Sequence, residues 1–363
     1  MPVGLVIMRW DERAGTELLA RYPEEIVLSD KVLMQVTSTH EYSGEVGMIS
    51  LSVGSLNIAS YYTGPEQGYY ILLLLNLEDD ADEFEGGLAE ASRRILHNLE
   101  NDSYLPLIPS IFQRLSVYPS LNAEQRLANL YQDDIKRMII NRLRDEGVIS
   151  KSELVIWLRD QYKTGIGDAE PVLLDLIKQE IIKESSVKSV SSELLFLIHD
   201  ILLMRIPPSN LIKDPSSKGL PFHLIENYKS ECAKFFQSYQ PTEQDDLNIL
   251  NIIIDPEVYT TLQLLRSAIV TRNDLEKLRK KGVDNLDKVL KTLWDAKMIQ
   301  VFRDNQNNEY YALISDVYLD SVFPKYVLNT IKTNYENKSK ADLVLVEYIN
   351  VLENIYSEKK AKI

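Results

Sequence analysis

The feature that most constrains the fold is an internal repeat in the C-terminal two thirds of the chain. The segment GVISKSELVIWL, residues 147–158, aligns with AIVTRNDLEKLR, residues 268–279. The alignment continues downstream through paired positions: Leu176 with Leu293, Ile182 with Ile299, Glu193 with Glu309, Asp200 with Asp316 and Pro208 with Pro324. We therefore expect two copies of one structural unit.

Each copy is predicted to run helix, short helix, third helix, strand, turn and strand. Ser150 opens the short helix of the first copy and Thr271 that of the second. This order resembles the winged-helix fold, in which the two strands form the wing. Apolar residues give each third helix a core-facing stripe: Leu173, Leu176 and Ile177, and Leu290, Leu293 and Trp294. We also expect Trp157 in the core.

Because many winged helices bind DNA, the charge of the third helices is informative. The first copy carries one lysine, Lys178, among four acids: Asp168, Glu170, Asp175 and Glu180. In a major groove these acids would face the phosphates with like charge, and the Arg, Asn and Gln cluster that reads bases is missing. The first copy is therefore predicted not to bind DNA.

The second copy is less one-sided, since its third helix, DNLDKVLKTLWDAK, balances three acids with three lysines. A basic cluster precedes it: Lys277, Arg279, Lys280 and Lys281. Two interpretations stay open, a patch that contacts phosphate or an acidic protein surface, and an ordinary solvated face. We take these four residues as the candidate interaction site.

The N-terminal segment is acidic, with 18 acidic and 6 basic residues in positions 1–104. This charge repels nucleic acid and anionic lipid. Its pattern predicts strands at 4–10, 16–23 and 69–77, with two more strands between 47 and 63. A helix from Ser29 should bury Leu33, Val36 and His40, and a second should bury Phe84, Leu88, Ala91, Ile95 and Leu99.

An acidic run separates the last of these strands from the second helix. It contains Asp79, Asp80, Asp82, Glu83 and Glu85. At a helix N-terminus these carboxylates face unpaired N–H groups and the positive end of the dipole. A calcium loop would need alternating ligands, a glycine and a distal glutamate, so we interpret the run as a helix start.

The order strand, strand, helix, three strands, helix resembles the longin module of trafficking proteins, as in an archaeal-type longin-domain protein followed by two winged helices. The opening hairpin GLVIMRWDERAGTELLARYP and the buried strand GYYILLLLNL carry the resemblance, which covers about the first 115 residues. The related roadblock module begins with a helix instead. The resemblance implies an α+β fold with a five-stranded antiparallel sheet, and a small GTPase as a candidate partner.

We therefore expect three parts: a longin-like domain at 1–118, a linker helix with the first winged helix at 119–240, and the second winged helix with C-terminal helices at 241–363. A capping box at Asn122 and Gln125 predicts one continuous helix to Glu146. The tail carries a short apolar stripe that could pack on the second winged helix or form a homodimer: Leu345, Ile349, Leu352 and Tyr356.

The sequence shows no motif for catalysis or for a cofactor. Phosphate-binding and dinucleotide glycine patterns, G-x-S-x-G and H-E-x-x-H are missing. The single cysteine, Cys232, is expected as a packed core thiol, and neither a cofactor nor a metal is predicted. With no signal-peptide pattern and no run of about 18 apolar residues, we expect a cytoplasmic protein.

Two functions remain open. One is a non-enzymatic protein-interaction scaffold or regulator, linked to a small GTPase or to trafficking. The other is a transcriptional regulator, whose N-terminal module senses a ligand while the second winged helix binds DNA. The charge of the third helices favours the scaffold.

Overall fold

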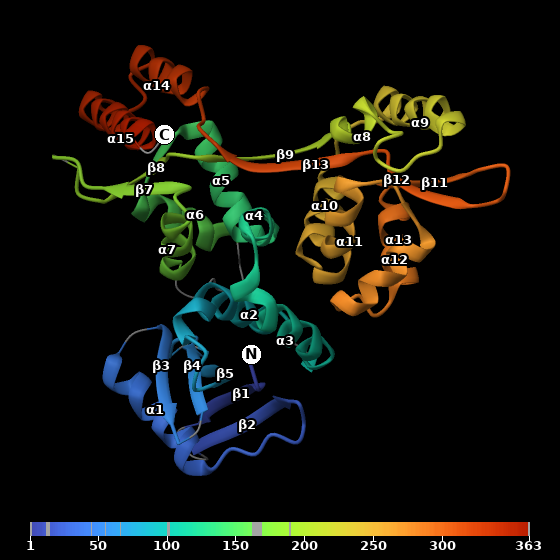
Figure 1. Cartoon of the computed structure of the whole chain (residues 1–363). Helices are drawn as coiled ribbons and strands as arrows, with labels where there is room; N and C mark the ends of the chain where they lie inside the picture. The colour runs from blue at the N-terminus through green and yellow to red at the C-terminus, as the bar shows by residue number, and fades with distance from the viewer. Residues whose placement is uncertain are drawn as a thin grey trace. The chain divides into compact units, whose positions relative to one another are not determined.

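The computed structural model describes residues 2–11, 15–44, 46–54, 56–65, 67–99, 102–161, 169–188 and 190–361. The fold is α+β (Figure 1). The chain forms two compact units, each built from separate stretches of sequence. The first comprises Met1–Leu121, Val148–Phe196 and Lys338–Ile363, and the second comprises Asn122–Gly147 and Leu197–Asn337.

The N-terminal part of the first unit is a five-stranded antiparallel sheet, as predicted. Its order is β2-β1-β5-β4-β3, so that β5 is the central strand. The strands are β1 (Gly4–Asp11), β2 (Gly15–Tyr22), β3 (Gly47–Val53), β4 (Leu56–Tyr62) and β5 (Tyr69–Asn76).

Helices cover both faces of this sheet (Figure 1). Because side chains alternate along a strand, Leu72 and Leu74 of β5 pack with α1 (Asp30–Ser43), while Ile71 and Leu73 pack with α2 (Glu85–His97) and α3 (Ile108–Val117). This explains the continuous apolar run of β5, which is buried on both faces. The predicted inward residues of α1, Leu33, Val36 and His40, are buried.

The acidic run lies at the start of the second helix, as interpreted. It contains the 3₁₀ turn η1 (Ala81–Phe84), which leads into α2. The Asp80 carboxylate accepts a hydrogen bond from the Asp82 amide at 3.0 Å. The Asp79 carboxylate accepts one from the Asn76 amide at 3.1 Å. These two acids therefore satisfy backbone donors at the turn and the helix start.

The continuous helix predicted from Asn122 to Glu146 is wrong. The capping box forms, but the segment contains two helices, α4 (Ala123–Gln132) and α5 (Asp134–Glu146). They meet at Asp133, which has extended backbone (ψ 118°). Its carboxylate accepts hydrogen bonds from the amides of Ile135 and Lys136 at 3.0 and 3.1 Å. A side chain that caps a new helix competes with continuation of the previous one.

Residues Val148–Phe196 of the first repeat copy belong to the first unit. It contains α6 (Lys151–Gln161), α7 (Glu170–Lys178) and a sheet of order β6-β8-β7, whose strands are β6 (Val148–Ser150), β7 (Ile182–Ser185) and β8 (Leu194–Leu197). Ser150 opens α6, since its hydroxyl accepts a hydrogen bond from the Glu153 amide. Asp168, one of the four predicted acids, lies outside the described residues.

The C-terminal helix α15 (Asp342–Ala361) also belongs to the first unit. Its Tyr348 is fully buried, with its ring 5.0 Å from that of Phe196 in β8. The predicted stripe is half right, because Leu345 and Leu352 are buried whereas Ile349 and Tyr356 are exposed. The helix therefore packs through a face centred on Tyr348, against a strand of the first repeat.

The second copy lies in the second unit and repeats the element order of the first. Its three-stranded sheet has the order β10-β12-β11, equivalent to β6-β8-β7. The elements are α11 (Pro256–Ser267), β10 (Val270–Thr271), α12 (Arg272–Glu276), the 3₁₀ turn η6 (Lys277–Lys281), α13 (Leu286–Asp295), β11 (Ile299–Arg303) and β12 (Glu309–Leu313). The unit also contains α8 (Ser209–Lys213), η5 (Phe222–Leu224), α9 (Ile225–Ser238), α10 (Glu243–Ile254) and α14 (Val327–Glu336).

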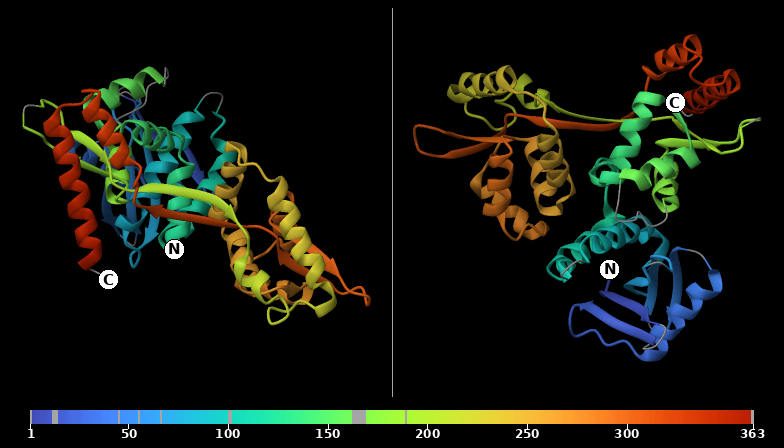
Figure 2. Two further views of the ribbon diagram at one scale, coloured as in Figure 1. Left: turned by 90° about the horizontal axis from the view of Figure 1, so that it is seen from above. Right: turned by 180° about the vertical axis from the view of Figure 1, so that it is seen from behind.

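Each copy is followed by a long strand, and these strands pair with each other. β9 (Asp200–Ile206) and β13 (Asp316–Val322) form an antiparallel two-stranded ribbon (Figure 2). The two strands also carry equivalent ion pairs at their first residues. Arg144 of α5 donates to Asp200 at 2.8 Å, and Arg266 of α11 donates to Asp316 at 2.8 Å. The alignment paired the two aspartates, but it did not identify their arginine partners.

Candidate docking face of the second repeat

The predicted basic cluster forms the turn η6, between α12 and α13, and all four of its side chains are exposed. The turn ends at Gly282, whose φ of 87° is a left-handed conformation that glycine adopts without strain. The cluster therefore lies on the surface, directly before the third helix of the second copy.

Half of the cluster's positive charge is neutralised within the same segment. Lys277 Nζ lies 2.7 Å from Asp274 Oδ1, and Arg279 Nε lies 2.5 Å from Glu276 Oε2. Hydrogen bonds from Lys277 and Thr271 lower the pKa of Asp274 to about 2, and Arg279 lowers the pKa of Glu276. Within the described part of the chain, Lys280 and Lys281 have no ion pair. Only these two lysines add uncompensated positive charge to the turn.

The outward face of α13 mixes charge with one large aromatic. Its buried stripe is Leu286, Val289, Leu290 and Leu293. Trp294, predicted to be in the core, is 46% exposed. At about 100° per residue, Trp294 lies a quarter turn beyond Leu293, which brings it to the edge of the buried stripe. It shares the exposed side with Asp287, Lys291 and Asp295.

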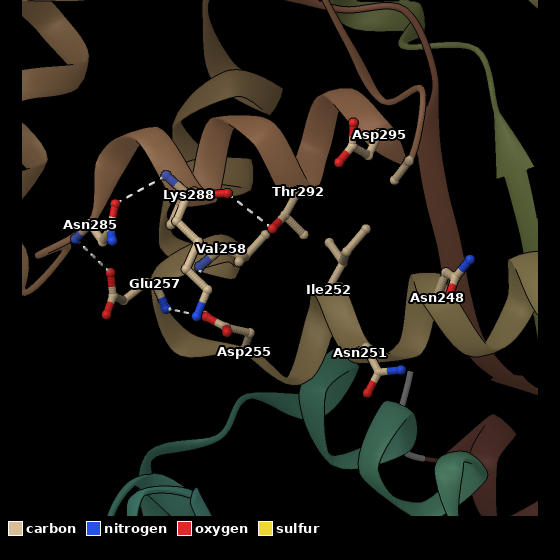
Figure 3. Close-up of a pocket in the computed structure, with 12 residues that line it drawn as sticks. Asn248, Asn251, Ile252, Asp255, Glu257, Val258, Asn285, Lys288, Thr292 and Asp295 are labelled. Atoms are coloured by element: carbon tan, nitrogen blue, oxygen red, sulfur yellow. Dashed lines mark hydrogen bonds between the residues drawn. The ribbon is translucent and has the colours of Figure 1, made fainter.

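A groove of about 500 Å³ runs along the opposite flank of α13. Figure 3 shows Ile252 and Val258 pointing from α10 and α11 toward α13. These two side chains and Val289 are buried and form an apolar floor. Polar side chains surround this floor, and the complete lining is Asn248, Asn251, Ile252, Asp255, Glu257, Val258, Asn285, Lys288, Val289, Thr292, Asp295 and Ala296. We call this the α13 groove.

Two side chains that line the groove, Asp255 and Asn285, also cap the helices that form it (Figure 3). The Asp255 carboxylate caps α11, accepting from the amides of Glu257 and Val258 at 3.0 Å. Asn285 Oδ1 caps α13 at the Lys288 amide. Glu257 Oε2 accepts from the amides of Asp284 and Asn285 at 3.1 and 3.2 Å. The walls are therefore fixed by side chains at the rim.

Arg205 of β9 connects both walls of the groove from behind. Its guanidinium donates two hydrogen bonds to Asp245 in α10, at 2.8 and 2.6 Å, and one to the carbonyl of Ala296 at the end of α13, at 2.9 Å. The side chain is only 2% exposed. A planar donor with this fork geometry sets the position of both groups at once. Arg205 is a positioning residue for the groove.

The charge around the groove is net negative. Three carboxylates line it, those of Asp255, Glu257 and Asp295, against one ammonium group, that of Lys288. One Asp255 oxygen and one Glu257 oxygen are occupied by backbone amides, which leaves the second oxygen of each carboxylate for other contacts. The lining includes no histidine, cysteine or serine. Its carboxylates and its ammonium group can form ion pairs and hydrogen bonds with a ligand.

Two other chemically active side chains among the described residues, Cys232 and His40, are buried. Cys232 is 3% exposed, and burial raises the pKa of its thiol to about 11, as expected for a packed core thiol. His40 lies on the buried face of α1, with its Nε2 3.0 Å from Ser60 Oγ. The described residues include no group of three or more His, Cys, Asp or Glu side chains arranged to hold a metal ion.

Comparison with known proteins assigns the chain to no family. No protein-family model matches the chain, and no similar protein is found among the curated proteins. Within the ranges that the structure describes, no helix combines the length and apolar character needed to cross a membrane.

Proposed function

We propose that this chain is a non-enzymatic protein-interaction scaffold, in which the second repeat is a winged helix used for protein docking. One observation carries the proposal. The helix that would enter a DNA groove, α13, has an acid-rimmed groove on one flank and alternating charges with a half-exposed tryptophan on the other. Tryptophan is enriched at protein interfaces and among the residues that contribute most to their affinity.

The charge of this face argues against DNA as the ligand. A helix inserted in the major groove brings its flanks within reach of phosphates on both sides, where each carboxylate is repelled. Asp295 and Asp287 are exposed on α13 itself. The lysines of α13 are outnumbered once Asp255 and Glu257 of the adjacent wall are included. A peptide or protein surface with basic groups would meet no such repulsion.

The N-terminal module supports the same proposal. Its sheet order and its helices on both faces fit a longin-like platform, for which a small GTPase in the cytoplasm is the candidate partner. Its acidic balance, 18 acidic against 6 basic residues in positions 1–104, disfavours nucleic acid.

Two measurements on the full chain test the proposal. Affinity capture from native lysate should recover a defined partner, and Trp294→Ala should weaken this capture because it truncates the exposed aromatic. Leu328→Ala, on α14 and 52% exposed, is the matched control and should capture normally. If Trp294→Ala and wild type capture the partner equally, the flank of α13 that carries Trp294 is not the docking surface.

A gel shift with duplex DNA at physiological salt separates the scaffold from the regulator. We expect at most non-specific binding, with Kd in the range of about 10⁻⁴ to 10⁻⁶ M. Sequence-selective binding near 10⁻⁸ M, weakened by changing Lys280 and Lys281 to Glu, would favour the ligand-sensing transcriptional regulator instead.

A further inference from the structure

We propose that the α13 groove binds an extended, five-residue segment of a partner protein, with basic residues at its first and fifth positions and an apolar residue at the third. This inference rests on the proposed scaffold function and specifies the class of ligand that the groove takes. Three properties of the groove lead to it: the separation of its acids, its apolar floor and its volume.

The acids mark the two ends of the groove. Glu257 lies at one end, where its carboxylate accepts the amide of Asn285 at the start of α13. Asp295 lies at the other end of the same helix (Figure 3). Ten helical residues separate positions 285 and 295, which corresponds to about 15 Å at 1.5 Å per residue. Two basic side chains of one ligand could therefore contact the two ends.

An extended chain matches this spacing. At about 3.3 Å per residue, the first and fifth residues of a strand lie about 13 Å apart. The first, third and fifth side chains also project from the same face of an extended chain. If the outer two are lysine or arginine, the third points into the middle of the groove.

The floor of the groove determines the central residue. Ile252, Val258 and Val289 are each at most 4% exposed, and they lie between the two acidic ends. An apolar side chain placed there removes mainly its own apolar surface from water, because the floor residues are already nearly buried. This contributes about 25 cal/mol per Å² of ligand surface. A volume of about 500 Å³ is within the range of ligand pockets in proteins.

The charge balance selects basic over acidic ends. The three carboxylates of the lining outnumber its single lysine, Lys288. The pattern therefore favours two positive ligand groups and disfavours phosphate or carboxylate groups, because like charges brought together cost free energy.

The test is fluorescence anisotropy of the full-length protein with labelled pentapeptides. The probe has lysine at positions one and five, leucine at position three and alanine elsewhere. One control peptide places both lysines at adjacent positions, and the other replaces both lysines with glutamate. We expect saturable binding of the probe, with weaker binding of the adjacent-lysine peptide and none of the glutamate peptide.

The groove variant is Glu257→Gln combined with Asp295→Asn. Glutamine keeps an oxygen for the amides of Asp284 and Asn285, so the fold should be retained, and thermal unfolding checks this. Loss of two exposed ion pairs should weaken probe binding by about two- to thirtyfold. The matched control changes two exposed acids outside the groove, Glu226→Gln and Glu353→Gln, and should bind as wild type does.

Failure of this inference is distinct from failure of the scaffold function. If wild type does not bind the probe, or if the groove variant binds it as tightly as wild type, the ligand assignment is wrong. Lysate capture by wild type would still support the scaffold in that case. Conversely, absence of any captured partner would contradict the scaffold, whatever the peptide affinities are.

Discussion

At the scale of single residues, burial changes the chemistry of His40. It is 1% exposed, its Nε2 lies 3.0 Å from Ser60 Oγ, and the rings of Tyr62 and Tyr70 lie about 5.5 Å away. Its Nδ1 is buried without a hydrogen-bond partner among the described residues. Desolvation by burial lowers the pKa of His40 from 6.5 to about 4.

This pKa predicts a loss of stability in mild acid. Between pH 6.5 and 4 the unfolded chain binds a proton at His40 and the folded chain does not, so the free energy of unfolding falls as pH decreases. At about 1.4 kcal/mol per pKa unit, the loss is about 3 kcal/mol by pH 4. Urea unfolding of wild type and His40→Gln at pH 7.5 and 4.5 measures it.

His40→Gln should remove most of this pH dependence, since glutamine can still contact Ser60 but does not titrate in this range. His223→Gln provides the control, because His223 is exposed and should leave the pH dependence unchanged. If wild type and His40→Gln lose the same stability between the two pH values, burial of His40 is not the cause.

At the scale of elements, the sequence predicted what periodicity controls. The run at Tyr69–Asn76 became the central strand, and Leu33, Val36 and His40 mark the buried face of α1, because apolar spacing specifies both element type and inward face. The prediction from sequence failed where a single polar side chain sets a helix boundary. Asp133 ends one helix and starts another, and no apolar pattern reports this.

The sequence also did not predict the tertiary contacts of charged groups. The repeat alignment paired Asp200 with Asp316, yet Arg144 and Arg266 contact them from α5 and α11, far away in sequence. The α13 groove was missed for the same reason. Its walls come from α10, α11 and α13, and its shape depends on how these helices pack. The sequence signal for this groove was the pair of acids Asp255 and Glu257, which flank the helix-starting proline Pro256.

The boundary between α4 and α5 at Asp133 predicts a measurable contribution of this side chain to stability. Asp133→Ala removes the acceptor for two amides of α5 and should destabilise the chain by about 1 kcal/mol. Urea unfolding at pH 7 measures this. Asp134→Ala is the control, because the Asp134 side chain is 72% exposed and pairs with Arg137 at the surface, so its loss should cost less than 1 kcal/mol. Equal effects of the two variants would contradict a capping role for Asp133.

At the scale of the whole molecule, the first unit raises the question of which stretch can fold alone, since it combines three separate stretches of sequence. The two core clusters of the N-terminal sheet lie entirely between Leu5 and Leu115. Tyr118 then packs on Gly87, where a Cβ would lie 2.8 Å from the tyrosine ring. A fragment of residues 1–118 therefore contains the described residues of both core clusters.

We predict that residues 1–118 fold independently and residues 1–104 do not. The shorter fragment lacks α3, whose Ile108, Ile111 and Leu115 are at most 5% exposed. Each such side chain contributes about 1.5–3 kcal/mol by burial, and together they equal much of the 5–15 kcal/mol that stabilises a typical domain. The longer fragment should show cooperative urea unfolding and dispersed amide NMR signals, and the shorter one neither. A molten or aggregated 1–118 fragment would mean that the sheet depends on segments 148–196 or 338–363 for its stability.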